Sequence, residues 1–295
     1  MGIFCNRVTS SQLLVGAGLY LINFAAHANE PQIEKDKSVY HLFNPTPKEL
    51  MRELSTDRPD KTESPYTVDA GHFQVEMDLV NYSYDHYNPD HIRNESFSFA
   101  SANLKVGLCN NTDFQLIVPT YNTVRSKDRL LGKTQNQSGF GDLIARLKMN
   151  FWGNDGGTTA FGAMPFLKFP TAQDDLGNNA YEGGIIFPLA VQLPREWQIG
   201  MMTELDFNKD ESGGGHHAEF INSITFSHQI IGDLAGYTEF FSSVSAESDS
   251  RWIATVDVGL VYALTENIQL DTGMNFGITR AADDFNPFAG ITIRF

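Results

Sequence analysis

Ser227 and His228 are the first residues to consider for chemistry, because a serine activated by a histidine is the nucleophile of many hydrolases. The two are consecutive within an extended pattern, and neighbours in a strand point to opposite faces, so they cannot act on each other. The chain also has no Gly-x-Ser-x-Gly nucleophile motif. The sequence therefore predicts that the protein is not an enzyme, with a hydrolase as the least favoured alternative.

A second candidate for chemistry is the run Gly213–His217, whose two histidines are of a type that binds metals. Two histidines are too few for a site without a third ligand nearby, for which Glu211 and Glu219 are candidates. The pairs Asp174-Asp175 and Asp283-Asp284 could bridge divalent cations to lipopolysaccharide, although solvated loop charge is the simpler interpretation. We therefore predict no metal site and no cofactor.

The remaining charges follow a pattern, since many of them occupy alternate positions between apolar residues. In Trp197–Phe207 the odd positions are mostly apolar and the even ones mostly polar or small, which is the period of a strand with one oily and one wet face. On this parity the following charged side chains face one interior: Glu76, Asp78, Lys105, Asp142, Arg146, Lys148, Glu204, Asp206, Glu219, Glu239, Asp257, Asp271 and Arg294.

The elements that position these charges are strands of a closed sheet. Segments of this kind are expected at 71–83, 96–108, 113–123, 140–151, 158–169, 182–193, 197–208, 218–230, 234–245, 252–264, 268–279 and 287–295. Their even number, their lengths and the alternation of long and short connections are typical of a transmembrane antiparallel β-barrel of about twelve strands with both termini in the periplasm. The interior charges would then line a lumen, where they set selectivity or pair across it and close it.

The first 69 residues differ from the barrel segments. Residues 1–28 have the charge, apolar run and Ala26-His27-Ala28 ending of a signal peptide, and we expect cleavage after Ala28. Residues 29–69 are predicted to form a periplasmic or plug segment with one short helix at 47–54, and residues 70–295 the barrel. Of the two cysteines, Cys5 would leave with the signal peptide, so no disulfide within the mature chain is expected.

Composition narrows the environment and the partners. The net charge of −15 argues against nucleic acid, and a mean hydropathy of −0.26 is compatible with a barrel because lipid-facing and lumen-facing residues alternate. Aromatic residues near strand ends suit the two interfaces of a bilayer. We expect the bacterial outer membrane, its lipid and lipopolysaccharide as surroundings, and recognition of Phe295 by the barrel-assembly machinery.

The stretch from Ser55 to Glu76 carries a resemblance to a known family. Its Asp-Arg-Pro-Asp core at Asp57–Asp60, the Glu-Ser-Pro run at Glu63 and the Gly-His-Phe-Gln-x-Glu lead into the first strand resemble outer-membrane transporters of the phenol meta-cleavage degradation pathway. Gly139–Leu143 fits the same family. The resemblance extends from about residue 55 to the end, and it implies passage of aromatic or other small hydrophobic compounds.

We therefore predict a passive channel for small, hydrophobic or aromatic solutes. The alternative is a structural or surface-binding barrel whose lumen is closed by paired charges. As a hypothesis, Asp57, Arg58, Asp60 and Glu63 lie at or in the periplasmic mouth and contact lumen charges as a plug or gate.

Overall fold

A computed structural model describes residues 36–295 except residue 212. The chain forms one sheet of strands β1 (Phe73–Asp85), β2 (Ile92–Phe99), β3 (Ala102–Cys109), β4 (Thr112–Val118), β5 (Tyr121–Asp128), β6 (Thr134–Gly139), β7 (Leu143–Trp152), β8 (Thr159–Phe169), β9 (Glu182–Gln192), β10 (Trp197–Lys209), β11 (His216–Ile231), β12 (Leu234–Ser245), β13 (Ile253–Thr265), β14 (Ile268–Gly277) and β15 (Phe285–Arg294). The predicted signal peptide and residues 29–35 lie outside the described residues.

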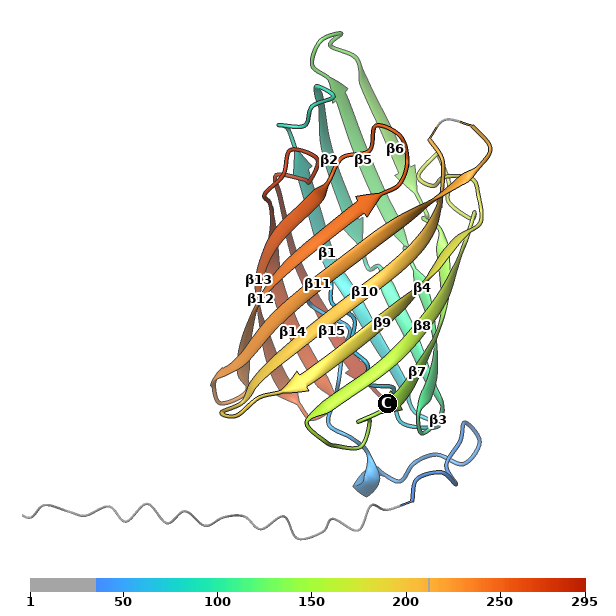
Figure 1. Cartoon of the computed structure of the whole chain (residues 1–295), viewed down its shortest axis with the longest axis vertical. Coiled ribbons are helices and arrows are strands. Elements are labelled where there is room, and N and C mark those ends of the chain that lie inside the picture. The colour runs from blue at the N-terminus through green and yellow to red at the C-terminus, as the bar shows by residue number, and fades with distance from the viewer. Residues whose placement is uncertain (1–35, 212) are drawn as a thin grey trace, which may run out of the picture. The chain divides into compact units, whose positions relative to one another are not determined.

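The sheet closes on itself into an antiparallel barrel, because β15 pairs with β1 (Figure 1). Three strands of the barrel are each interrupted and so consist of two segments: β2 with β3, β4 with β5, and β6 with β7. In register, β1 pairs with β3 in its first half and with β2 in its second half. Counting each interrupted pair as one gives the twelve-stranded barrel that the sequence predicts.

The alternation of side chains explains why this chain closes. Along β1, Gln74 and Glu76 are buried toward the inside, while Phe73 and Leu79 are exposed on the outside. A closed barrel leaves no strand edge unpaired in the hydrocarbon layer, and its outer face presents apolar side chains to the lipid. None of the helices in the described residues is both long and apolar enough to cross a membrane.

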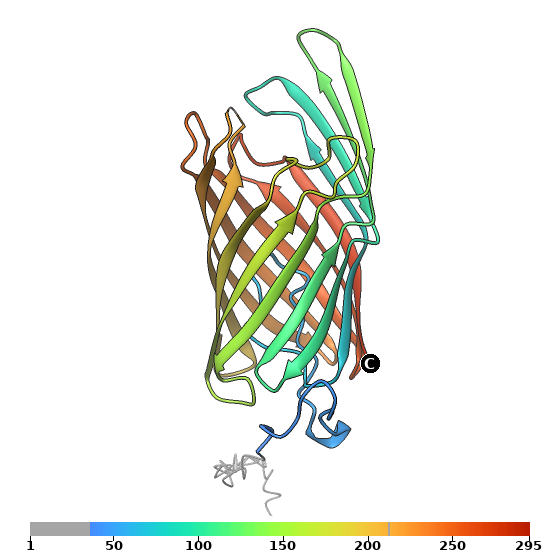
Figure 2. The same ribbon diagram turned by 90° about the vertical axis from the view of Figure 1, so that its right-hand side faces the viewer.

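Two sequence-based expectations differ from the structure. Residues 124–139 were expected to be a loop, but β5 and β6 form a hairpin that projects past the other connections (Figures 1 and 2). Its strands carry polar side chains on both faces, so hydrophobic alternation cannot reveal them. The helix at 47–54 is also wrong, because only the 3-10 turn η1 (Lys48–Leu50) forms. A helix this short is marginal by itself, and the chain becomes extended at Met51 before Arg52 turns toward the barrel.

The connections separate the two ends of the barrel. The turns that begin at Cys109, Gly153, Leu193, Ile231 and Thr265 lie at one end, together with the C-terminal residue Phe295. The segment before β1 is also at this end, and it passes into the lumen (Figure 2). We refer to residues 37–54 as the base segment and to residues 55–69 as the plug.

Candidate functional site

The base segment is fastened to the short-turn end of the barrel by charge and by main-chain bonds. Arg52 contacts Asp69 at 3.3 Å and Asp155 at 3.1 Å, and Lys37 contacts Asp155 at 2.6 Å. Arg294, a predicted lumen residue, donates to the carbonyl of Arg52 at 2.8 Å. The base segment therefore bridges the end of β15 and the turn after β7.

Asp57 is the centre of the plug. Its carboxylate accepts hydrogen bonds from the ammonium groups of Lys105 on β3 and Lys148 on β7, and Lys105 also pairs with Glu76 on β1. The main-chain amide of Ser64 donates to the same carboxylate at 3.0 Å. All four charged groups are almost completely buried. Burial by itself would raise the pKa of Asp57, but the two ammonium groups outweigh it and hold that pKa well below the ordinary value.

Arg58 extends from the plug toward β1 and β14, away from Lys105 and Lys148. Its guanidinium contacts Asp78 on β1 at 2.5 Å and Asp271 on β14 at 2.7 Å. It also lies 5.8 Å from the ring centre of Phe288 and passes over Gly290, where a Cβ would meet it at 2.2 Å. The absence of a side chain at Gly290 thus gives the guanidinium room against the wall.

The far tip of the plug is Lys61-Thr62. The amide of Thr62 donates to Glu239 on β12 at 2.8 Å, and its hydroxyl lies 2.6 Å from the hydroxyl of Ser223 on β11. Lys61 contacts Asp257 on β13 at 3.1 Å. The plug therefore reaches across the lumen from β3 and β7 to β11, β12 and β13.

Asp60 and Glu63 make different contacts. Glu63 forms an ion pair with Arg146 on β7 at 2.5 Å. Asp60 is close to Glu239, and burial together with this second carboxylate raises its pKa well above the ordinary value. Of the four predicted plug residues, Asp57, Arg58 and Glu63 form ion pairs with the barrel wall. Asp60 forms none with any residue that the structure describes.

Next to Glu63 the inner wall changes character. Met164 on β8, Ile186 on β9 and Met202 on β10 are almost completely buried and pack together with Phe166 and Ile221. The amide of Glu63 lies 3.5 Å from the sulfur of Met202. We call these five side chains the apolar wall cluster. No charged side chain belongs to it, and it spans four adjacent strands.

Beyond the plug, toward the long connections, the lumen is lined by acids. Asp142 accepts from the amides of Thr171 and Ala172 at 2.9 Å each and so fixes the connection after β8. Asp206 is directly opposite Glu219 in the register of β10 and β11, and Glu204 is two residues from Asp206 on the same face. These four predicted residues lie on the inner wall, where Asp142 and Glu219 form hydrogen bonds with the wall and its loops.

Several residues of this network were missed in the sequence. Lys168 and Glu182 pair on adjacent strands, and Asp113 accepts from the amide of Val68 at 2.9 Å. The parity of the expected strands would have placed all three inside. No periodicity marks the base-segment contacts of Arg52, since they depend on the tertiary path of the chain.

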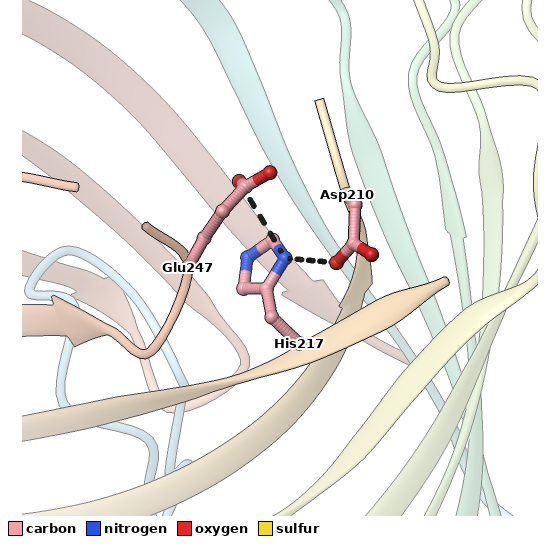
Figure 3. Close-up of side chains that lie close together, drawn as sticks. All are labelled: Asp210, His217 and Glu247. Carbon is pink, nitrogen blue, oxygen red and sulfur yellow. Dashed lines mark hydrogen bonds and ion pairs between the residues drawn. The ribbon is translucent and has the colours of Figure 1, made fainter. Parts of the chain in front are cut away.

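His217 lies in a cluster at the long-connection end (Figure 3). Its Nδ1 is 3.1 Å from Asp210 and 3.6 Å from Glu247, and the amide of Glu211 donates to Glu247 at 2.8 Å. His216 points instead to the carbonyl of Tyr181. The carboxylates beside His217 are therefore those of Asp210 and Glu247, and not those of Glu211 and Glu219.

The hydrolase alternative has no support in the geometry of Ser227 and His228. The His228 ring stacks on Trp197 with ring centres 4.5 Å apart, and its Nδ1 lies 3.3 Å from the carbonyl of Glu196. Trp197 belongs to the exposed outer face of β10. Ser227, the adjacent strand residue, faces the other side.

Comparison with known proteins places this architecture in a family. The model of the family described as "Putative MetA-pathway of phenol degradation" matches residues 56–295. The chain belongs to this family. The resemblance seen in the plug and the first strand is thereby confirmed, and the match begins within the plug. A search of curated proteins finds no match.

Solved structures support the fold. An outer membrane channel from Pseudomonas putida F1 is similar with a TM-score of 0.62 and 14% identity, over 82% of this chain and 100% of that one. The transport unit of the autotransporter AIDA-I from Escherichia coli is similar with a TM-score of 0.50 and 9% identity, over 81% of this chain and 92% of that one. Identities this low establish the barrel fold alone.

Proposed function

We propose that the protein is a passive outer-membrane channel for small hydrophobic or aromatic molecules, and not an enzyme. The observation that carries this is the apolar wall cluster. Closure by paired charges does not require five apolar side chains beside the plug, whereas an aromatic solute leaving water would bury its surface there.

The family supports the solute class, because its description concerns phenol degradation. The Pseudomonas putida neighbour is itself described as an outer membrane channel. We further propose that Asp57, Arg58 and Glu63 act as a gate, because their ion pairs hold the plug across the lumen while the apolar wall cluster makes no ion pair with it.

The proposal also places the outer wall of the barrel in the lipid of the outer membrane. Apolar side chains cover the outer wall, and Trp152, Trp197, Tyr181 and Trp252 are exposed near strand ends as interfacial aromatics require. We infer that lipid and lipopolysaccharide surround the barrel, and that the exposed C-terminal Phe295 is the feature recognised by the assembly machinery.

The experiment is a flux measurement in liposomes that contain the purified protein. Uptake of phenol is compared with uptake of a sugar of similar size in wild-type protein and in Met202→Gln, which places an amide in the apolar wall cluster. Uptake by protein-free liposomes is subtracted for each solute, because phenol crosses a lipid bilayer unaided. We expect faster uptake of phenol than of the sugar, and a severalfold loss of the phenol flux alone in the variant. Equal rates for both solutes in wild type would contradict a preference for aromatic molecules.

Deletion of residues 29–60 tests the gate separately. This deletion removes Asp57 and Arg58, and single-channel conductance should rise. Unchanged conductance would refute the gate. No flux of any solute with or without the plug would favour the alternative, a structural or surface-binding barrel.

A further inference from the structure

A group of cations on β2 and β5 has no part in the lumen. Arg93 is directly opposite Lys127 in the register of these strands, and Glu95 is opposite Arg125. The four side chains line a shallow surface pocket. We call Arg93, Arg125 and Lys127 the outer cationic cluster.

The face on which this cluster lies follows from its neighbours. Phe97 and Phe99, two and four residues after Glu95 on β2, are exposed, and Phe97 packs on Tyr82 of β1 with ring centres 4.4 Å apart. Since side chains two residues apart share a face, Arg93 and Glu95 are on the same outer surface as these rings. The guanidinium of Arg93 lies 5.7 Å from the ring centre of Tyr84.

The depth of the cluster is also fixed by register. Tyr84 is opposite Glu95 on one side and Phe285 of β15 on the other, and the Tyr84 and Phe285 rings stack 5.3 Å apart. Aromatic rings of this kind mark the boundary between hydrocarbon and headgroups. The outer cationic cluster starts where this boundary ends, on the side of the long connections.

The charges of the cluster are not balanced within the protein. Arg93 pairs with Glu95, and Arg125 reaches the same carboxylate only at 3.9 Å. Lys127 has no ion pair with any residue that the structure describes, and it faces Arg93, an arrangement that destabilises a sheet. Yet the chain as a whole has a net charge of −15. An anionic group bound between Arg93, Arg125 and Lys127 would remove the repulsion.

We propose that the outer cationic cluster binds a phosphate group of lipopolysaccharide in the outer leaflet. This rests on the outer-membrane location in the proposed function, but not on any passage of solutes. Lipopolysaccharide carries phosphates on the sugars directly above its acyl chains, at the depth where the aromatic boundary gives way to cations. Two guanidinium groups offer the paired donors that phosphate oxygens prefer, and Lys127 adds a point charge.

The test is a titration of purified lipopolysaccharide into the detergent-solubilised protein in the presence of EDTA, which removes divalent bridges. The variant carries Arg93→Gln, Arg125→Gln and Lys127→Gln together. We expect binding at least about tenfold weaker, because charge-assisted hydrogen bonds are lost. A matched control removes the same charge elsewhere through Lys133→Gln, Arg195→Gln and Arg280→Gln, and should bind nearly as wild type does.

A second variant changes binding in the other direction. Glu95→Gln removes the carboxylate of the cluster, so affinity for lipopolysaccharide should increase severalfold. Wild-type affinity in the triple variant would overturn the proposal. Equal binding of phosphatase-treated lipopolysaccharide, or of phosphatidylglycerol vesicles, would overturn it as well, because the site would then not read the phosphates of this glycolipid. None of these outcomes depends on flux through the barrel.

Discussion

The two sides of the lumen hold the plug by different forces. On the side of β1, β3 and β7, Asp57 is held by the buried ammonium groups of Lys105 and Lys148. On the side of β8 to β10, the plug faces the apolar side chains around Met202, and the amide of Glu63 lies beside the Met202 sulfur. A hydrophobic solute can replace the second kind of contact but not the first. We therefore propose that a solute passes along the apolar side while the plug stays attached to the charged side.

The largest effect is expected from Asp57→Asn. The change leaves the buried ammonium groups of Lys105 and Lys148 without their shared carboxylate, and loss of one partner of a buried ion pair costs about 3–5 kcal/mol. The thermal midpoint should fall and single-channel conductance should rise. Conductance and midpoint equal to wild type would show that the charged side does not hold the plug.

Arg58→Gln should have a smaller effect of the same sign. Of its two partners, Asp78 is partly accessible to water and only Asp271 is fully buried, so one desolvated carboxylate is left behind rather than the two buried ammonium groups left at Asp57. We expect a loss of about 2–3 kcal/mol in unfolding free energy, with a modest rise in conductance. Arg251→Gln, which breaks an exposed pair with Asp90, is the control and should change neither.

Ile186→Ala should act on the apolar side alone. Truncation of a buried isoleucine costs about 2–4 kcal/mol in a sealed core, and less here if solute or water fills the space. We expect about 1–2 kcal/mol in unfolding free energy and a lower flux of phenol, with ion conductance unchanged. A change in ion conductance equal to that of Asp57→Asn would erase the distinction between the two sides.

An effect of the opposite sign is expected from Asp60→Asn, the same chemical change three residues from Asp57. Because the pKa of Asp60 is raised in the folded protein, the carboxyl stabilises the fold in its protonated form, and that contribution is lost as pH rises above the ordinary aspartate value toward the raised one. The thermal midpoint of the variant should match wild type near pH 4 and exceed it as pH increases. A drop at neutral pH would show that Asp60 is ionised and paired.

The fold could be predicted from the sequence because every strand of a barrel in lipid must alternate apolar side chains on the outside with other side chains on the inside. The segment from Trp197 to Phe207 follows that rule except at Met202 and Thr203, and the twelve strands can be predicted from it. The hairpin that contains β6 extends past the barrel and is polar on both faces, so the rule does not apply there and the sequence predicts a loop. The inward direction of Glu76 and Asp271 could be predicted too. Their partners in the plug could not, because Arg58 and Asp271 are brought together only by closure of the barrel.

The order of contacts along the base segment has a mechanical consequence. Lys37 and Arg52 hold the turn after β7, and only behind them does the chain reach Asp57. A pull on the chain from the N-terminal side would therefore load these attachments in series, with Lys37 first and Asp57 later. The force needed at any moment would be that of one attachment rather than of all together. A segment arranged in this way would detach one contact at a time, at a lower peak force than a plug whose contacts must all break together.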